Sequence, residues 1–366
     1  MKIVTGVRRC GKSYLLFKLF RDYLISSGIQ GDHIISIALD DYGNRQLLDP
    51  AALYRHVKAL IVDGGEYYIL LDEIQLVKDF ESVVNGFLHI PNTDVYVTGS
   101  NSKFLSSDVV TEFLGRGDEI RVYPLNFSEF YSAYGGDFNN AWLMFCNYGD
   151  MPLCLSMQTQ ADKAKYLVNL FEATYLADII NRNKLRGNVE INELTDILAS
   201  SIGSLTNPLK LSNTFASTKK VKLSANTISA YLGYLQDAFL IEKALRFDIK
   251  GKKYINTPAK YYFVDMGLRN ARLSFRQQEY THIMENVIYN ELRCRGYSVD
   301  VGVVETVSKE DGAWVRKPLE VDFVVNLGNR RYYIQSAYDI PSEEKMQQEQ
   351  ASLLSINDAF RFNAEY

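Results

Sequence analysis

The chain has 366 residues, of which 47% are hydrophobic and 23% are charged, so it can form two or three folded domains and is not a disordered protein. Its formal net charge of −4 gives no overall attraction to nucleic acid. The four cysteines show neither metal-ligand spacing nor a disulfide pattern, and no stretch approaches the roughly 18 apolar residues that span a bilayer. We therefore expect a cytoplasmic protein with no membrane partner.

The first predicted elements are a strand at Lys2–Thr5 and a helix at Ser13–Leu24. The turn between them, GVRRCGKS, fits the phosphate-binding pattern G-x-x-x-x-G-K-[ST]. In this pattern backbone N–H groups cradle phosphate oxygens, the lysine reaches the β- and γ-phosphates, and the hydroxyl binds Mg²⁺. We predict an ATP and Mg²⁺ site, with Lys12 also acting in catalysis and Ser13 as a metal ligand. The predicted nucleotide-binding residues are Gly6, Arg8, Arg9, Cys10, Gly11, Lys12, Ser13 and Tyr14.

A strand is predicted at Ile34–Leu39, and a second apolar run follows at Tyr67–Leu71, directly before Asp72 and Glu73. Continuous apolar runs of this length are typical of buried parallel strands. Asp72 is predicted to hold Mg²⁺ through water, and Glu73 to act as the general base on the attacking water. A protein that only binds phosphate needs one acid, so the adjacent pair favours hydrolysis.

A further strand, Asp94–Thr98, leads into small polar residues. Ser100 and Asn101 are predicted to lie near the γ-phosphate, although a simple polar turn is the alternative. Arg116 is predicted to supply positive charge to the transition state, within the chain or to a neighbouring subunit of an oligomer, with a structural salt bridge as the alternative. Strands alternating with helices predict an α/β fold with a parallel sheet, and an ATPase domain over residues 1–130.

The middle of the chain is predicted to be helical over residues 131–202. A helix from Leu223 to Leu235 and two short strands follow, at Phe239–Phe247 and Lys253–Ile255, which is the order of a winged helix and predicts one over residues 203–265. Residues 203–260 contain ten Lys plus Arg and three Asp plus Glu, a net charge of +7. This segment favours contact with nucleic acid, although a solvated basic surface is the alternative.

In the C-terminal part, residues 266–366, Glu285 lies in a predicted helix, and Asp322 and Gln335 match an acidic strand followed by the pattern (D/E/Q)-x-K. This arrangement resembles the restriction-endonuclease-like core. In such sites the acids hold Mg²⁺ and the lysine assists the nucleophile. Ala337 occupies the lysine position and cannot supply a charge, so we predict an inactive module, with a plain α/β domain as the alternative.

The blocks GVRRCGKS, LLDEIQ, VTGSNSKFLSS, FLGR and YPLNFSEF together resemble a widespread prokaryotic family of AAA-type P-loop ATPases that carry a poorly characterised C-terminal domain. The resemblance continues through NYGDMP and KYYFVDMGLRNA, and it implies the same ATPase and winged-helix order. Family members usually have a short helical segment before the first strand, whereas this sequence begins on the strand.

Three functions are open. The adjacent Asp72 and Glu73 favour a Mg²⁺-dependent ATPase that acts as a nucleotide-driven switch. The basic segment favours an ATP-regulated nucleic-acid-binding protein. The third hypothesis, an active nuclease, is weakened because Ala337 stands where the lysine of the pattern is expected. A small-molecule kinase is disfavoured because no lid-like cluster of arginines is evident and a winged-helix pattern follows.

Overall fold

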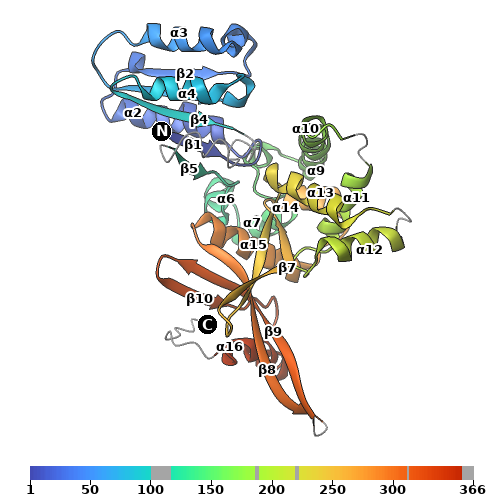
Figure 1. Ribbon diagram of the computed structural model, residues 1–366. Coiled ribbons are helices and arrows are strands. Elements are labelled where there is room, and N and C mark those ends of the chain that lie inside the picture. The colour runs from blue at the N-terminus through green and yellow to red at the C-terminus, as the bar shows by residue number, and fades with distance from the viewer. Residues whose placement is uncertain (100–116, 186–188, 219–221, 311–312, 357–366) are drawn as a thin grey trace. The chain divides into compact units, whose positions relative to one another are not determined.

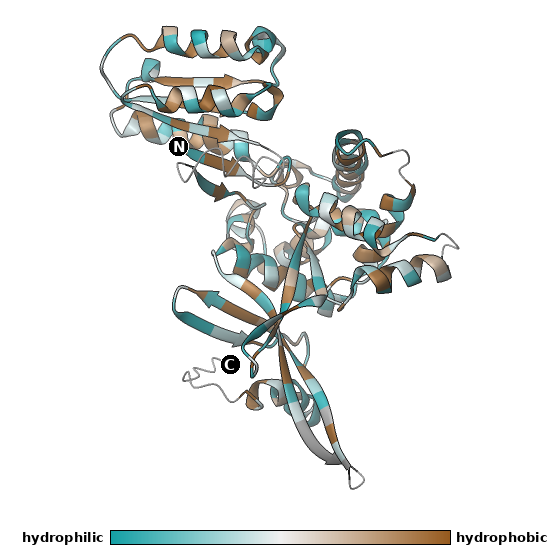
Figure 2. Ribbon diagram, in the orientation of Figure 1, coloured by the Kyte–Doolittle hydropathy of each residue, from teal (hydrophilic) through white to brown (hydrophobic). Residues whose placement is uncertain are grey.

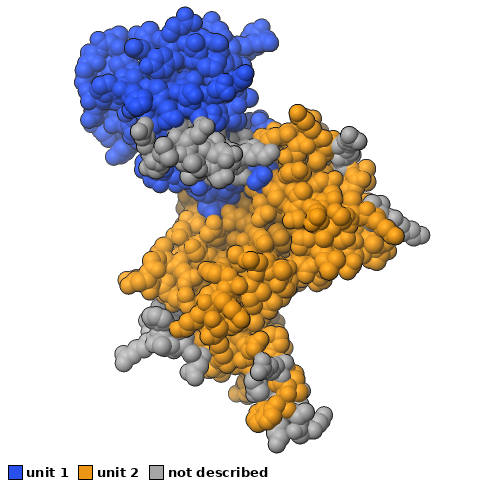
Figure 3. All heavy atoms as spheres, in the orientation of Figure 1, with its two compact units in different colours: residues 1–124, 237–239 blue, residues 125–236, 240–366 orange. Residues whose placement is uncertain are grey.

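The computed structural model describes residues 1–99, 117–185, 189–218, 222–310 and 313–356. The chain divides into two compact units (Figure 3). Unit 1 comprises Met1–Pro124 and Asp237–Phe239, and unit 2 comprises Leu125–Gln236 and Leu240–Tyr366. The predicted end of the ATPase domain at residue 130 lies six residues beyond the end of the first segment of unit 1. Among the described residues, no helix combines the length and apolar character that crossing a bilayer requires.

Unit 1 is built on a five-stranded parallel sheet with the strand order β2-β3-β4-β1-β5, which confirms the predicted parallel α/β fold (Figure 1). The carboxyl ends of parallel strands meet at one edge of a sheet, and ligands bind there. The strands β1 to β4 are largely hydrophobic, as expected for strands buried on both faces, whereas the edge strand β5 is polar and mostly exposed (Figure 2). Their bounds are β1 (Lys2–Thr5), β2 (Ile34–Ala38), β3 (Tyr67–Asp72), β4 (Thr93–Thr98) and β5 (Asp118–Arg121).

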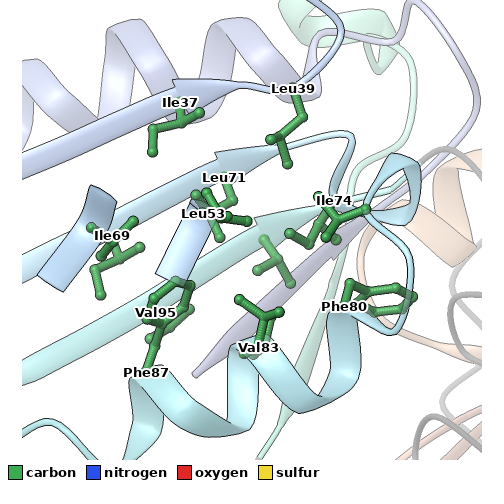
Figure 4. Close-up of a cluster of buried hydrophobic side chains, with 14 of the residues drawn as sticks. Ile37, Leu39, Leu53, Ile69, Leu71, Ile74, Phe80, Val83, Phe87 and Val95 are labelled. Atoms are coloured by element: carbon green, nitrogen blue, oxygen red, sulfur yellow. The ribbon is translucent and has the colours of Figure 1, made fainter. Parts of the chain in front are cut away.

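Helices cover both faces of this sheet. On one face, α3 and α4 pack Leu53, Val83 and Phe87 against Ile69 and Val95 (Figure 4). Side chains alternate between faces along a strand, so Leu70 points the other way, where it packs against Leu16 and Leu24 of the first helix. The helical elements of unit 1 are α1 (Lys12–Tyr14), the π-helical η1 (Leu15–Phe20), α2 (Arg21–Ser26), η2 (Gly31–His33), η3 (Tyr42–Leu48), α3 (Pro50–Leu60), η4 (Ile74–Leu76) and α4 (Phe80–Leu88).

The late segment Asp237–Phe239 belongs to unit 1, where Phe239 makes a cation–π contact. The guanidinium carbon of Arg121 lies 3.8 Å from the ring centroid of Phe239, a cation–π distance. Arg121 ends β5, and the next residue, Val122, contacts the phosphate-binding loop. Unit 1 therefore includes three residues that lie more than a hundred positions beyond Pro124, where its first segment ends.

The first part of unit 2 is helical, as predicted. Its helix α14 is almost wholly buried and packs against α7, α9 and α11. The helical elements of unit 2 are α6 (Phe127–Tyr134), α7 (Phe138–Tyr148), α8 (Pro152–Ser156), α9 (Gln160–Asn169), η6 (Leu170–Leu176), α10 (Ala177–Arg182), α11 (Val189–Ser200), α12 (Pro208–Thr218), α13 (Ala225–Asp237), α14 (Met266–Arg272), α15 (Tyr280–Cys294) and α16 (Glu343–Leu354).

Two buried aspartates meet at the start of α14. The Asp265 carboxylate accepts hydrogen bonds from the backbone N–H groups of Leu268 and Asp150, the latter at 2.8 Å. Burial and the neighbouring Asp265 carboxylate raise the pKa of Asp150 well above its ordinary value of 3.8. Two carboxyl groups therefore lie together in the core of unit 2, where burial favours the neutral form of the Asp150 carboxyl group.

The second sheet, in unit 2, has the strand order β10-β9-β8-β6-β7. Its bounds are β6 (Ile241–Asp248), β7 (Lys253–Phe263), β8 (Ser298–Glu310), β9 (Ala313–Leu327) and β10 (Arg330–Ile334). The two predicted strands after α13 exist, but they do not form a separate wing. Because β6 pairs in parallel with β8, the hairpin extends this larger sheet, and the predicted boundary between residues 265 and 266 divides one structural unit.

Candidate nucleotide-binding site

The loop between β1 and the first helix turns back on itself through left-handed backbone conformations. Gly6, Arg9 and Gly11 have φ angles of 144°, 65° and 107°. A Cβ atom added to Gly6 would lie 2.1 Å from the carbonyl oxygen of Val122, so only glycine fits between the loop and the residue after β5. The strand–loop–helix order that the sequence predicts is present, and it gives a loop that can cradle phosphate.

Lys12 lies inside this loop. Its side chain is 5% exposed, and Nζ donates hydrogen bonds of 3.0 Å to the carbonyl oxygens of Gly6 and Val7. A phosphate in the loop would compete with these two carbonyls for the ammonium group. Ser13 and Tyr14 are exposed beside it, as is Arg9, while Arg8 is half-buried.

Cys10 packs beneath the loop. Its side chain is buried, and Sγ donates a weak hydrogen bond of 3.5 Å to the carbonyl oxygen of Val122. Burial raises the pKa of the Cys10 thiol, although Lys12 acts in the opposite direction. The thiol therefore fills space beneath the loop, where burial disfavours its thiolate form.

The acidic pair stands at the carboxyl end of β3, where a neighbouring threonine fixes it. Thr98, fully buried at the end of β4, donates its hydroxyl proton to Asp72 Oδ1 and accepts a 3.0 Å hydrogen bond from the backbone N–H of Glu73. Glu73 has a left-handed backbone, with φ of 54° and ψ of 44°. Thr98 thus sets both the side chain of Asp72 and the turn that carries Glu73.

A second polar side chain contacts Glu73. Gln75, in the turn η4, donates a hydrogen bond from Nε2 to Glu73 Oε2. The acid that the sequence assigns as general base is therefore held by Thr98 at its backbone and by Gln75 at its carboxylate.

The predicted residues meet at one edge of the sheet, because β1, β3 and β4 run in parallel and their carboxyl ends coincide there. Ser100, Asn101 and Arg116 lie outside the described residues. Sequence reasoning missed Thr98 and Gln75. The signal for Thr98 was its place as the last residue of an apolar strand, one position before the residues that were considered as sensors.

The residues at this edge fit a nucleotide with Mg²⁺. Mg²⁺ prefers oxygen ligands and is usually held by one or two carboxylates together with substrate phosphates. Asp72 supplies a carboxylate and Ser13 an exposed hydroxyl. Among the described residues, no group of three or more His, Cys, Asp or Glu side chains is placed to hold a metal ion alone. A Mg²⁺ ion at this edge would therefore need phosphate oxygens of the nucleotide as additional ligands. The ion would in turn offset the negative charge of those oxygens.

The C-terminal acids are occupied by partners within the chain. Lys260 Nζ lies 2.8 Å from Glu285 Oε1 and 2.7 Å from Glu320 Oε1, and it is almost fully buried. Although burial lowers the pKa of Lys260, the two carboxylates together raise it above its ordinary value. Asp322 Oδ2 accepts 2.8 Å hydrogen bonds from the N–H and hydroxyl of Ser336. Lys260 of β7 therefore lies between Glu285 and Glu320 and forms an ion pair with each of these two carboxylates.

Comparison with known families matches residues 1–131 to an AAA domain and residues 139–279 to a domain of unknown function, DUF8612. An uncharacterized protein of Haemophilus influenzae is 34% identical over 367 residues, covering 99% of this chain and 87% of that protein. An uncharacterized protein of Methanocaldococcus jannaschii is 30% identical, covering 98% of this chain and 79% of that protein.

Two solved structures are similar at a much lower level. The ORC1 protein of Aeropyrum pernix, solved in complex with DNA, is 12% identical, with 74% of this chain and 85% of that chain aligned at a TM-score of 0.28. The Cdc6p protein of Pyrobaculum aerophilum is 10% identical, with 79% and 88% aligned at a TM-score of 0.29. Superpositions this loose carry no argument about function.

Proposed function

Since the chain belongs to the family of AAA-type P-loop proteins that these two uncharacterized relatives represent, we propose that it is a Mg²⁺-dependent ATPase that acts as a nucleotide-driven switch. The observation that carries the proposal is the fixed acidic pair at the end of β3. Thr98 bonds to the side chain of Asp72 and to the backbone of Glu73, which holds the two acids in separate positions for separate tasks.

In the proposed reaction each residue has one role. The loop N–H groups and Lys12 bind the phosphates, Asp72 and Ser13 hold Mg²⁺, and Glu73 accepts a proton from the attacking water. Lys12 stabilises the charge that develops in the transition state. Ser100 and Asn101 remain proposals for contact with the γ-phosphate, and Arg116 remains a proposal for transition-state charge within the chain or across an oligomer.

The test compares two lysines of the helical segment that follows the loop, Lys12 in α1 and Lys18 in η1. Lys12→Ala is expected to remove ATP binding or turnover, because loss of a charged contact in a dry site costs several kcal/mol. Lys18→Ala is the control, since within the described part of the chain Lys18 forms an exposed ion pair, with Asp22 at 2.8 Å. Unchanged affinity and unchanged turnover in Lys12→Ala would refute the assignment.

A second candidate, an ATP-regulated nucleic-acid-binding protein, is favoured by the turn between β6 and β7. Lys250, Lys252 and Lys253 are exposed there, beside Tyr254, which is 57% exposed. Cations next to an exposed ring are a common means of binding phosphate and base together. The test measures ATP turnover with single-stranded DNA, duplex DNA and RNA. The double variant Lys252→Glu, Lys253→Glu should lose any stimulation, and Lys165→Glu, a change at an exposed lysine of α9, should keep it.

A further inference from the structure

We propose that Gln75 orients the attacking water for Glu73. The inference rests on the proposed ATPase function and adds to it a residue that acts on the nucleophile. Gln75 lies two residues after Glu73 in the turn η4, at the carboxyl edge of the sheet where the phosphate-binding loop also ends.

The hydrogen bond between the two side chains fixes the orientation of the amide. Glu73 Oε2 only accepts when the carboxylate is ionised, so the partner atom of Gln75 is the donor Nε2. The amide oxygen Oε1 is bonded to the same carbon and therefore lies close to the Glu73 carboxylate. The geometry places an uncharged acceptor directly beside the proposed general base.

This acceptor is not used within the part of the chain that the structure describes. Gln75 Oε1 is buried and makes no hydrogen bond to any described residue. A buried acceptor without a partner costs about 1–3 kcal/mol, and such an atom in a native protein calls for a physical reason. A role in catalysis is one such reason, because the missing donor is then supplied by the reactants.

The attacking water supplies that donor. In hydrolysis the water oxygen forms a bond to the γ-phosphorus, and the bond from that phosphorus to the bridging oxygen of ADP breaks. One proton of the water passes to the Glu73 carboxylate as the new bond forms. The second proton stays on the water oxygen that becomes bonded to phosphorus. This O–H group needs a hydrogen-bond acceptor that does not compete with Glu73 for a proton. A neutral amide oxygen meets this requirement, and with both protons engaged the water's lone pair points at phosphorus.

The test replaces Gln75 with methionine, which has a similar length but neither donor nor acceptor. Turnover of Gln75→Met is expected to fall roughly 10- to 100-fold, the scale of losing one oriented polar contact to the reacting atoms. ADP affinity should stay within about twofold, since the ground state does not use this contact. Affinity for ADP with aluminium fluoride, which holds the nucleophilic water in place, should fall by a factor similar to the fall in turnover. Leu76→Ala, at an exposed neighbour in the same turn, is the matched control and should change none of these values.

Three results would overturn the inference. Unchanged turnover in Gln75→Met would show that the amide does not act on the water, and increased turnover would show that Gln75 restrains Glu73. A fall in turnover with full affinity for the aluminium fluoride complex would show a structural role only. Gln75→Ala, which leaves space for a second water, is the second variant and should lose less turnover than Gln75→Met. If the parent chain itself does not hydrolyse ATP, the proposed function fails; if only the Gln75 results disagree, the inference alone fails.

Discussion

Replacing Thr98 with valine removes a single hydroxyl group and keeps the shape of the side chain. In the parent chain this hydroxyl donates to Asp72 Oδ1 and accepts from the Glu73 N–H, and Thr98 is fully buried. In Thr98→Val both partners lose their hydrogen bond in a place that water does not reach. A hydrogen bond to a charged group contributes about 1.5–3 kcal/mol, and an unsatisfied buried N–H costs about 1–3 kcal/mol. Partial relaxation of the turn lowers their sum, so we expect unit 1 to lose about 2–4 kcal/mol.

ATP turnover should fall as well, because Thr98 no longer fixes the position of the Asp72 carboxylate relative to the turn that carries Glu73. A displacement of about 1 Å at a reacting group costs on the order of 10²-fold in rate. Thr93→Val is the matched control on the same strand. Thr93 begins β4 and donates to the carbonyl oxygens of Phe87 and Ile90 at 3.0 and 2.9 Å, away from the carboxyl edge. It should lower stability and leave turnover unchanged.

Two spectroscopic signals separate the units in a urea titration. Both tryptophans, Trp142 and Trp314, lie in unit 2, so tryptophan fluorescence reports that unit and circular dichroism reports both. Thr98→Val should shift the part of the dichroism transition that belongs to unit 1 and leave the fluorescence transition in place. Normal turnover in a Thr98→Val protein that has lost stability would refute the idea that Thr98 positions the acidic pair.

Glu73→Gln is expected to keep ATP binding and lose about 10²- to 10⁴-fold in turnover, because an amide cannot accept the proton; turnover within a few-fold of the parent would exclude Glu73 as the base. Asp150→Asn should remove a pH dependence of unit 2. Because the folded pKa of Asp150 is raised above 3.8, its contribution to stability is present below that value and is lost as pH rises through the folded pKa, so the stability of unit 2 in fluorescence-detected urea titrations should fall less steeply with rising pH in the variant than in the parent. Burial also raises the pKa of Glu285 and of Asp300 in the same unit, so part of the fall remains in the variant. Lys260→Met should destabilise unit 2 by about 3–5 kcal/mol by leaving a buried carboxylate unpaired, and adding Glu285→Gln should restore part of the loss. With Mg²⁺ or Mn²⁺ the protein should leave plasmid, single-stranded DNA and RNA intact; nicking that Asp322→Ala abolishes would show that the nuclease-like site is active.

The sequence predicted the parts of the fold that depend on local pattern. The phosphate-binding loop needs glycine at fixed positions, and the buried strands read as continuous apolar runs, so β1, β3 and β4 were placed close to their observed bounds. The acidic pair was found because charged residues stand out at the end of such a run.

Long-range pairing was not predictable in the same way. A helix followed by two strands is the order of a winged helix and also of the first strands of a larger sheet. The parallel pairing of Arg246–Asp248 with Val301–Val303 shows that these strands belong to the larger sheet. Lys260 carried no signal for its ion pairs, because Glu285 and Glu320 follow it by 25 and 60 residues in sequence. Thr98 and Gln75 were missed because a threonine ending a strand and a glutamine in a turn are ordinary until their partners are known.

The membership of Asp237–Phe239 in unit 1 bears on how the protein is dissected. The chain passes from one unit to the other at residues 124–125, 236–237 and 239–240, so unit 1 is not a continuous N-terminal domain with a single linker to the rest of the chain. A fragment cut at Pro124 would contain all five strands of the sheet and the phosphate-binding loop, but Arg121 would lose the ring of Phe239 that covers its guanidinium. Low solubility or weak turnover of such a fragment would then reflect an incomplete unit, and a peptide spanning the missing residues, supplied in trans or grafted after Pro124, would be the remedy.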